Sequence, residues 1–260
     1  MRVGDIIRAV EEFAPLGIQE NWDNSGLCIG SEDDETGSVL VGFDCTPELI
    51  DEAVACGAGL VITHHPLLFR GIKRIDGTDP VGAALVKAVR GGIAVYAAHT
   101  TADKVIGGVS GAMARKIGLE DIGILCREED GVGLGAVGNL PSPLSAEEVL
   151  SLLKERFSLS VIRCSRPVRE PVRRIAVCGG AGADLIGEAR RAGAQLYVTG
   201  DLSYHRFAVP EGFMVADIGH FESEVEIVSI LISWIRKKIP TFAVRASERL
   251  NDGNLVRYYL

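Results

Sequence analysis

The chain has 260 residues, of which 47% are hydrophobic and 24% charged, which excludes a disordered polymer and leaves room for two folded domains. The formal net charge of −8 argues against nucleic-acid binding as the main task. The six cysteines form no CxxC pair, which is typical of buried, reduced thiols. The acidic, amphipathic start is no signal peptide, and the longest apolar run, IVSILISWI, is too short to cross a bilayer. We therefore expect a cytoplasmic protein that does not enter membranes.

Two stretches of the chain repeat each other without a gap. Residues 39–63 match residues 175–199 at nine of 25 aligned positions, and each copy reads strand, turn, helix, glycine, strand. Thr46 is typical of a helix start, and Gly57 and Gly193 are typical of helix ends. Chance similarity between two such units is the alternative, but the constant register favours duplication. The pattern predicts an α/β protein with two related α/β domains and mixed, mostly parallel sheets.

All five histidines follow predicted strands. The strands are expected over residues 59–63, 93–98, 195–199 and 213–218. The histidines at or just past their ends are His64, His65, His99, His205 and His220. Ligands of open α/β sheets bind at the carboxyl ends of the strands, so this edge is the predicted functional site.

His64 and His65 stand side by side at the tip of an apolar run. In a regular strand their rings point to opposite faces, so one of them could be a core histidine. Pro66 holds His65 extended at the point where the strand ends. We favour metal ligation, with one imidazole for each of two ions.

His220 and Glu224 are four residues apart in a predicted helix over residues 220–238, so they share one face. Glu224 could instead only complement the helix dipole, and Glu222 is the weaker candidate because it points elsewhere. Asp103 is a candidate ligand whose alternative role is a helix N-cap. With a histidine one turn away, we prefer Glu224 as a ligand.

Two further histidines have two interpretations each. His99 either fixes the turn through a backbone hydrogen bond or supports the ligands from a second layer. His205 is either a loop histidine packed on Tyr204 or a general acid and base beside the metals.

Weaker signals come from two loops and an arginine cluster. In NWDNSGLCIG we expect Trp22 to be structural and Asp23 and Asn24 to hold a turn. GGAG at residues 179–182 could cradle a phosphate, but it lacks the full dinucleotide pattern. A possible basic stripe is expected to be a solvated edge; it comprises Arg163, Arg166, Arg169, Arg173 and Arg174.

Three histidines with two carboxylates form a mixed nitrogen and oxygen ligand set, which suits two divalent ions of Zn, Fe or Mn rather than Ca or Mg. Glu224 is the expected bridge. Such ions lower the pKa of bound water, which indicates hydrolysis, with His205 moving a proton. The open alternatives are a nucleotide hydrolase, a phosphatase or phosphodiesterase, and a non-enzymatic metal-binding adaptor or storage protein.

Five motifs in order resemble the NGG-interacting-factor-like family of GTP cyclohydrolase I type 2 homologues: NWDNSGLCIG, THHPLLF, HTTAD, TGDLSYH and GHFESE. The resemblance implies a dinuclear metal site between two α/β domains, a homohexamer, and a nucleotide substrate attacked at C8 of guanine with release of formate. The family's ligand positions match His64, His65, Asp103, His220 and Glu224.

The resemblance also implies that both ends of the chain build one domain. We place that domain at residues 1–126 plus 217–260, and the other at residues 127–216. HTTAD differs from the family's HTNLD, and Asp201 and Tyr204 differ from its glutamate and paired histidines. These departures leave the ligands intact but alter the surroundings of His205, and therefore the expected substrate pocket.

Overall fold

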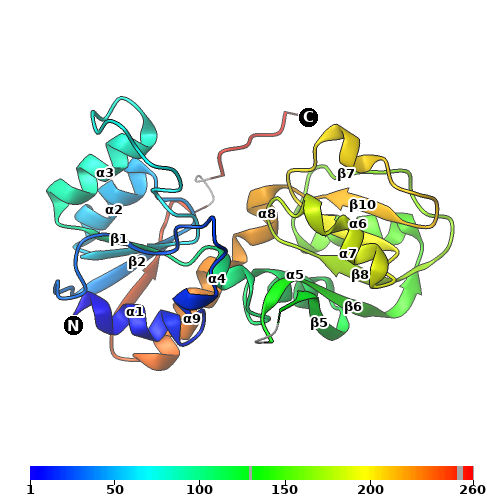
Figure 1. The fold of residues 1–260 in the computed structure, drawn as a ribbon, viewed down its shortest axis with the longest axis horizontal. Helices are drawn as coiled ribbons and strands as arrows, with labels where there is room; N and C mark the ends of the chain where they lie inside the picture. Colours follow the sequence, from blue (N-terminus) through cyan, green and yellow to red (C-terminus); the bar gives the residue numbers. More distant parts are fainter. Residues whose placement is uncertain (129–130, 251–253, 260) are drawn as a thin grey trace. The chain divides into compact units, whose positions relative to one another are not determined.

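The computed structural model describes residues 1–128, 131–250 and 254–259, and Figure 1 shows them as ribbon. The chain divides into two compact units. Unit 1 comprises Met1–Ala102 and Ile227–Tyr259, and unit 2 begins at Asp103 and ends at Glu226.

The division falls earlier in the chain than the predicted boundary after Cys126. Strand β5 (Glu120–Arg127) pairs antiparallel with β6 (Gly133–Leu144), so it belongs to the sheet of unit 2. At the other boundary, α8 (His220–Glu224) stays in unit 2 and α9 (Glu226–Lys238) lies almost wholly in unit 1. Both ends of the chain do build one unit.

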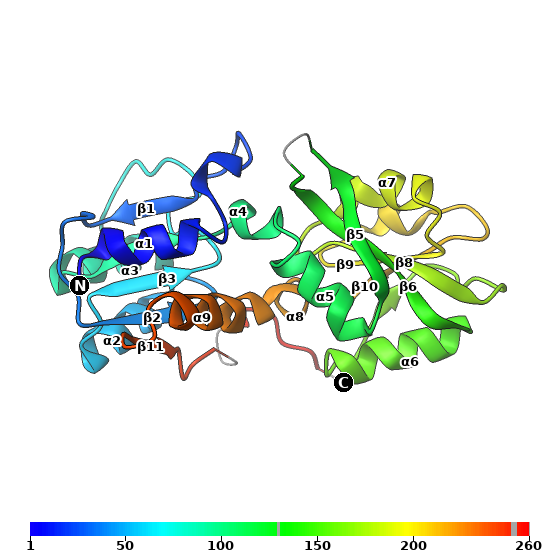
Figure 2. The same ribbon diagram turned by 90° about the horizontal axis from the view of Figure 1, so that it is seen from below.

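Unit 1 is a five-stranded sheet between two helical layers. Its strands, in sheet order, are β1 (Gly26–Ile29), β4 (Ala94–Ala97), β3 (Leu60–Thr63), β2 (Ser38–Gly42) and β11 (Ala243–Ala246). Only β1 runs antiparallel to its neighbour. Helices α2 (Pro47–Cys56) and α3 (Pro80–Gly91) cover one face, and α1 (Val3–Glu11) and α9 cover the other (Figures 1 and 2).

Both faces of this sheet are buried, as expected for parallel strands between helices. Leu40, Val61 and Val95 point from three adjacent strands into the core under α2 and α3. On the other face, the hydroxyl of the fully buried Tyr96 donates a hydrogen bond to the carboxylate of Glu11 on α1. The backbone of α1 in turn accepts the indole N–H of Trp234 from α9, which ties these two helices together.

Unit 2 is a six-stranded sheet whose antiparallel pairs lie toward its edges. Its order is β5, β6, β8 (Val172–Val177), β9 (Leu196–Thr199), β10 (Met214–Asp217) and β7 (Arg163–Cys164). The central pairs, β8 with β9 and β9 with β10, are parallel. The prediction of two α/β units with mixed sheets is confirmed.

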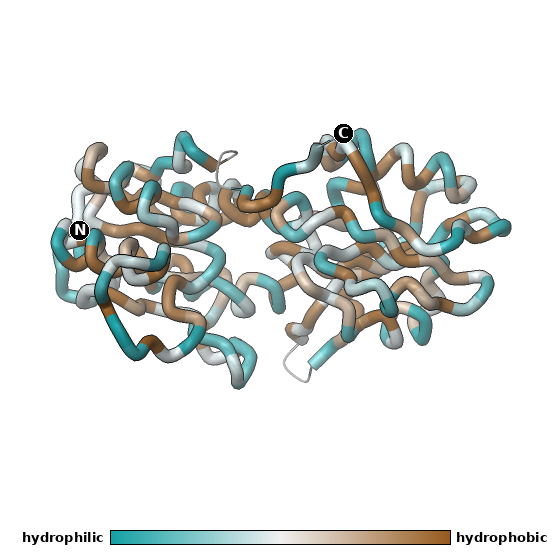
Figure 3. The backbone as a smooth tube through the Cα atoms, turned by 90° about the horizontal axis from the view of Figure 1, so that it is seen from above, coloured by the Kyte–Doolittle hydropathy of each residue, from teal (hydrophilic) through white to brown (hydrophobic). Residues whose placement is uncertain are grey.

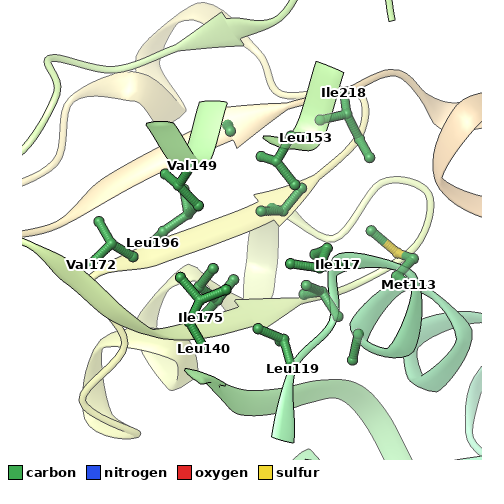
Figure 4. Close-up of a cluster of buried hydrophobic side chains, with 14 of the residues drawn as sticks. Met113, Ile117, Leu119, Leu140, Val149, Leu153, Val172, Ile175, Leu196 and Ile218 are labelled. Carbon is green, nitrogen blue, oxygen red and sulfur yellow. The ribbon is translucent and has the colours of Figure 1, made fainter. Parts of the chain in front are cut away.

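Helices cover both faces of this second sheet as well. On one face, α5 (Val109–Ile117) and α6 (Ala146–Arg156) bury a cluster that includes Met113, Leu153 and Ile175 (Figure 4). On the other face, α7 (Ile186–Arg191) packs on Tyr197 and Val215. Within each unit, hydrophobic stretches of the backbone alternate with hydrophilic ones, as Figure 3 shows.

The repeat predicted from the sequence exists as structure. β2, α2 and β3 form the first copy, and β8, α7 and β9 form the second, with parallel strands in both. Thr46 caps α2 by accepting from the Leu49 N–H, and Gly57 ends it in the left-handed conformation. All six cysteines are free thiols; Cys178 is buried, Cys164 is exposed and the other four are half-buried. No helix among the described residues is long and apolar enough to cross a membrane.

Candidate metal centre

Three histidines cluster at the carboxyl edge of the sheet in unit 1. β3 delivers His64 and His65, and the adjacent parallel β4 is followed by His99. The ring centroids of His64 and His65 are 4.9 Å apart, and each lies 5.5 Å from the centroid of His99. The predicted convergence of histidines at this edge is therefore present in unit 1.

Each of these three rings binds an oxygen acceptor through Nδ1. His64 Nδ1 lies 3.2 Å from the Ala98 carbonyl, and His65 Nδ1 lies 2.7 Å from Asp44 Oδ1. His99 Nδ1 lies 2.7 Å from the carboxylate of Asp23. A carbonyl or carboxylate oxygen only accepts, so Nδ1 is the hydrogen-bond donor in each pair. Nε2 is therefore the nitrogen that can ligate a metal, as in carboxylate–histidine–metal arrangements.

The partner of His99 is itself firmly held. Burial raises the pKa of the Asp23 carboxyl, but hydrogen bonds from His99, Thr100 and Ser25 outweigh it and hold that pKa well below its usual value. Asp23 is thus an anion whose position fixes His99. The predicted turn-holding role of Asp23 and Asn24 is confirmed, since Asn24 Nδ2 also donates to the Leu68 carbonyl at 2.6 Å.

Unit 2 carries its own set of candidate ligands on α8. His220 Nε2 lies 3.0 Å from Glu224 Oε2, one helical turn away, so the predicted stacking on one face is confirmed. His220 Nδ1 lies 2.8 Å from Asp201 Oδ2, which repeats the pattern of His65 and His99. The helix predicted over residues 220–238 is divided at Val225 into α8 and α9.

Burial separates the two glutamates of α8. The Glu224 residue is only 4% exposed, whereas Glu222 is half-buried. A buried carboxylate needs a partner cation or strong hydrogen bonds, which is what a ligand obtains from a metal. Glu224 therefore remains the better ligand candidate.

The glycine loop after β8 packs against these ligands. A Cβ on Gly180 would lie 2.3 Å from Glu224 Oε1 and 3.2 Å from the His220 ring, and Gly180 has φ +60°. Its N–H donates to Ser223 Oγ, and the Gly182 N–H donates to Thr199 Oγ1. Because these amides are engaged by side chains, the loop makes room for α8 instead of cradling a phosphate.

Asp217, at the end of β10, accepts hydrogen bonds that fix the segment leading into α8. Its Oδ1 accepts from the Gly219 N–H at 3.0 Å, and its Oδ2 accepts from the Leu202 N–H at 2.9 Å. Arg163 Nη1 pairs with the same carboxylate at 3.1 Å. One buried carboxylate thus fixes both the segment after β9, with Asp201, and the segment that begins α8.

Asp103 lies at the end of the short helix α4 (Thr100–Asp103) and is half-buried. It does not cap the next helix, because the N-cap of α5 is Gly108. Burial, together with the nearby charges of Asp103 and Glu224, raises the pKa of the Cys178 thiol to about 12. Cys178 is therefore a neutral thiol beside two carboxylates.

The remaining predicted positions have simpler surroundings. His205 is exposed in the 3-10 turn η3 (Tyr204–Phe207), with its ring 5.3 Å from that of Tyr204. Its catalytic role stays a prediction. Arg163 and Arg174 bind backbone carbonyls inside unit 2, which supports a structural role for part of the arginine cluster.

The sequence interpretation missed the residues that orient the histidines. Asp44, which follows β2, and Asp201, which follows β9, received no such role from the sequence. A carboxylate just after a strand of the same parallel sheet was the signal that could have found Asp44. Asp201 was noted only as a departure from a motif.

Comparisons with known proteins agree with this fold. A family model described as Duf34/NIF3 (NGG1p interacting factor 3) matches residues 1–252. A protein of Clostridium perfringens named "GTP cyclohydrolase 1 type 2 homolog" is 32% identical over 92% of this chain and 93% of its own length. A Lactococcus lactis protein with that name is 34% identical over 85% of this chain and 86% of its own. The crystal structure of Staphylococcus aureus protein SA1388 shares the fold, with a TM-score of 0.92, 24% identity and coverage of 100% and 99%.

Proposed function

This chain belongs to the Duf34/NIF3 family, and we propose that it is a metal-dependent hydrolase that acts on a nucleotide. The name shared by its relatives, "GTP cyclohydrolase 1 type 2 homolog", supports GTP as the first substrate to test. The proposed ligands of two divalent ions are His64, His65, Asp103, His220 and Glu224.

One observation carries the proposal: Nδ1 of each ligand histidine is engaged by an oxygen acceptor. His65 and His220 bind carboxylates, and His64 binds a backbone carbonyl. A histidine that serves only packing needs no such partner on a fixed nitrogen, whereas a metal ligand depends on it for ring orientation and basicity.

The donor set fits a divalent transition metal. Imidazole nitrogens with carboxylate oxygens suit Zn, Fe or Mn. Of the residues that the structure describes, His64 and His65 of unit 1 carry ring nitrogens that could hold a metal ion. Within each unit, the protein's own carboxylate and carbonyl oxygens orient these histidine rings.

When bound, such ions lower the pKa of water and neutralise developing negative charge. The chain's own residues supply orientation and proton movement. Asp44 and Asp201 hold the rings of His65 and His220, and burial keeps the carboxylate of Glu224 away from water. His205 is exposed, so it can exchange protons with solvent, as a general acid and base requires.

The test is metal analysis of the purified protein combined with GTP turnover, with formate and phosphate scored separately. We expect about two metal ions per chain by the two-metal scheme, and formate release from GTP. Glu224→Gln is expected to lose metal and turnover, while Glu222→Gln, on the same short helix, keeps both.

The other outcomes separate the alternatives. Phosphate without formate identifies a phosphatase. Metal without either product identifies a metal-binding adaptor or storage protein, and no metal after reconstitution overturns the proposal.

We also propose that the chain self-associates as a homohexamer. The support is the family membership alone. Light scattering is expected to give six times the chain mass of 27.7 kDa. A monomer or dimer at micromolar concentration contradicts it.

A further inference from the structure

Unit 1 places two large aromatic side chains at the surface beside its histidine cluster. Trp22 is 59% exposed and Phe69 is 45% exposed. They come from different segments, the turn before β1 and the loop after His65. Two neighbouring exposed rings form a candidate surface for binding a planar or apolar group.

The two rings form a corner with His99. Their centroids are 6.0 Å apart, and the rings stand at 73° to each other. The centroid of His99 lies 6.1 Å from that of Trp22 and 5.9 Å from that of Phe69, with interplanar angles of 77° and 88°. We call Trp22, Phe69 and His99 the aromatic corner.

Hydrogen bonds anchor the chain segments that carry the two exposed rings. The residues that follow Trp22 anchor its backbone: Asp23 is bound by His99, and Asn24 donates to the Leu68 carbonyl. That last bond joins the Trp22 turn to the residue before Phe69. A tryptophan side chain has only about two rotatable torsions, so it loses little conformational entropy when a ligand stacks on it.

The corner adjoins the proposed ligands. His99 is one of its walls, and the same ring packs 5.5 Å from His64 and from His65. Trp22 and Phe69 therefore contact the same His99 ring that packs on His64 and His65.

We infer that the aromatic corner is the subsite for the planar base of the substrate, a purine or a similar nitrogen heterocycle, which stacks on Trp22 with Phe69 at its edge. Bases stack on aromatic side chains through their π-faces. This inference rests on the proposed function for the choice of a nucleotide, but the stacking itself requires no metal.

Metal-free protein tests the inference separately from catalysis. The chain has two tryptophans, so Trp234→Phe leaves Trp22 as the fluorescent reporter. Trp234 bonds the Ala9 carbonyl and packs on Phe13, so circular dichroism must first show that this variant folds. We expect GMP to quench the Trp22 fluorescence, and ribose 5-phosphate, which lacks the base, to leave it unchanged.

Calorimetry in the otherwise unaltered chain then measures affinity. Trp22→Ala is expected to weaken GMP binding roughly 5- to 140-fold, the range that base–aromatic stacking supplies. Trp22→Phe keeps a ring and recovers most of the affinity. Val89→Ala is the matched control, because Val89 is 63% exposed on α3, near the opposite edge of the sheet, and GMP binding should not change.

The outcomes distinguish this inference from the proposed hydrolase. Base-dependent binding that needs Trp22, without GTP turnover, supports the subsite and refutes the hydrolase. Turnover with an unchanged KM in Trp22→Ala refutes the subsite alone. Absence of GMP binding, equal binding of ribose 5-phosphate, or an unaffected Trp22→Ala each overturns the inference.

Discussion

The two copies of the strand–helix–strand repeat differ in the turn that follows their first strand. In unit 1 the first strand is followed by Phe43 and Asp44, and in unit 2 the aligned residues are Gly179 and Gly180. The Phe43 ring packs on His64 and His65, and Asp44 binds His65. The copy in unit 1 therefore supports ligands from its own second strand.

The copy in unit 2 has no histidine at the matching strand end, where Gly200 and Asp201 align with His64 and His65. Its ligands arrive from α8, and the glycines give them room: Gly180 lies against Glu224, and Gly200 lies against the backbone of His220. In unit 1 the second strand of the repeat therefore carries candidate ligands itself. In unit 2 the glycines of the repeat make room for candidate ligands on α8.

Gly180→Ala tests whether the glycines of the copy in unit 2 make room for α8, and it has the largest expected effect. A Cβ there meets Glu224, and the left-handed backbone costs about 1–2 kcal/mol for a residue other than glycine. We expect metal content to fall to background and the metal-free protein to unfold at lower urea. Gly187→Ala in α7 is the control, because the atom nearest to its Cβ is 3.6 Å away on Arg191. Full metal content in Gly180→Ala would mean that α8 does not need this clearance.

Asp44→Gly puts the residue of the second copy into the first. His65 then loses the carboxylate that orients it, and metal affinity is expected to fall about 10- to 100-fold, with the fold retained. Competition with a chelator measures the affinity. Asp51→Ala on α2 removes an exposed carboxylate of the same unit and should leave affinity unchanged. Equal affinities in the two variants would refute the orienting role of Asp44.

Asp201→Asn makes the corresponding change beside His220, with a smaller expected effect. Its side chain is 58% exposed, so water can partly replace the lost charge, and we expect a loss of affinity of about tenfold or less. Asparagine tolerates the left-handed backbone of this position, φ +52°, so the fold is kept. If Asp201→Asn lost more metal affinity than Asp44→Gly in the same chelator assay, Asp201 and not Asp44 would be the more important orienting carboxylate.

Thr46→Ala tests the difference between the helices of the two copies. The Thr46 hydroxyl caps α2, whereas α7 begins without a side-chain cap. Unfolding free energy in urea is expected to fall by about 1 kcal/mol, with metal affinity unchanged. An altered metal affinity would show that α2 also positions Asp44.

Local patterns account for what could be predicted. Apolar runs that end in glycine or histidine identified β3, β4, β9 and β10, and Thr46 with Gly57 identified α2. The spacing of His220 and Glu224 was sufficient to predict their contact, because helical neighbours are set by sequence distance alone.

The orienting pairs could not be predicted in this way. Asp23 and His99 are 76 residues apart, and Asp201 and His220 are 19 apart. Nothing in their local sequence selects one partner over another, since strand order decides which loops meet.

The sequence by itself determined the elements of this protein, their duplication, and the candidate ligands at the strand ends, because hydrophobic period and capping chemistry act over a few residues. Tertiary structure alone decided which oxygen lies against Nδ1 of His64, His65, His99 and His220, why the glycine loop packs beside α8, and that Trp22 and Phe69 meet at His99. Those features depend on strand pairing and on close approach between segments distant in the chain, which no local pattern encodes.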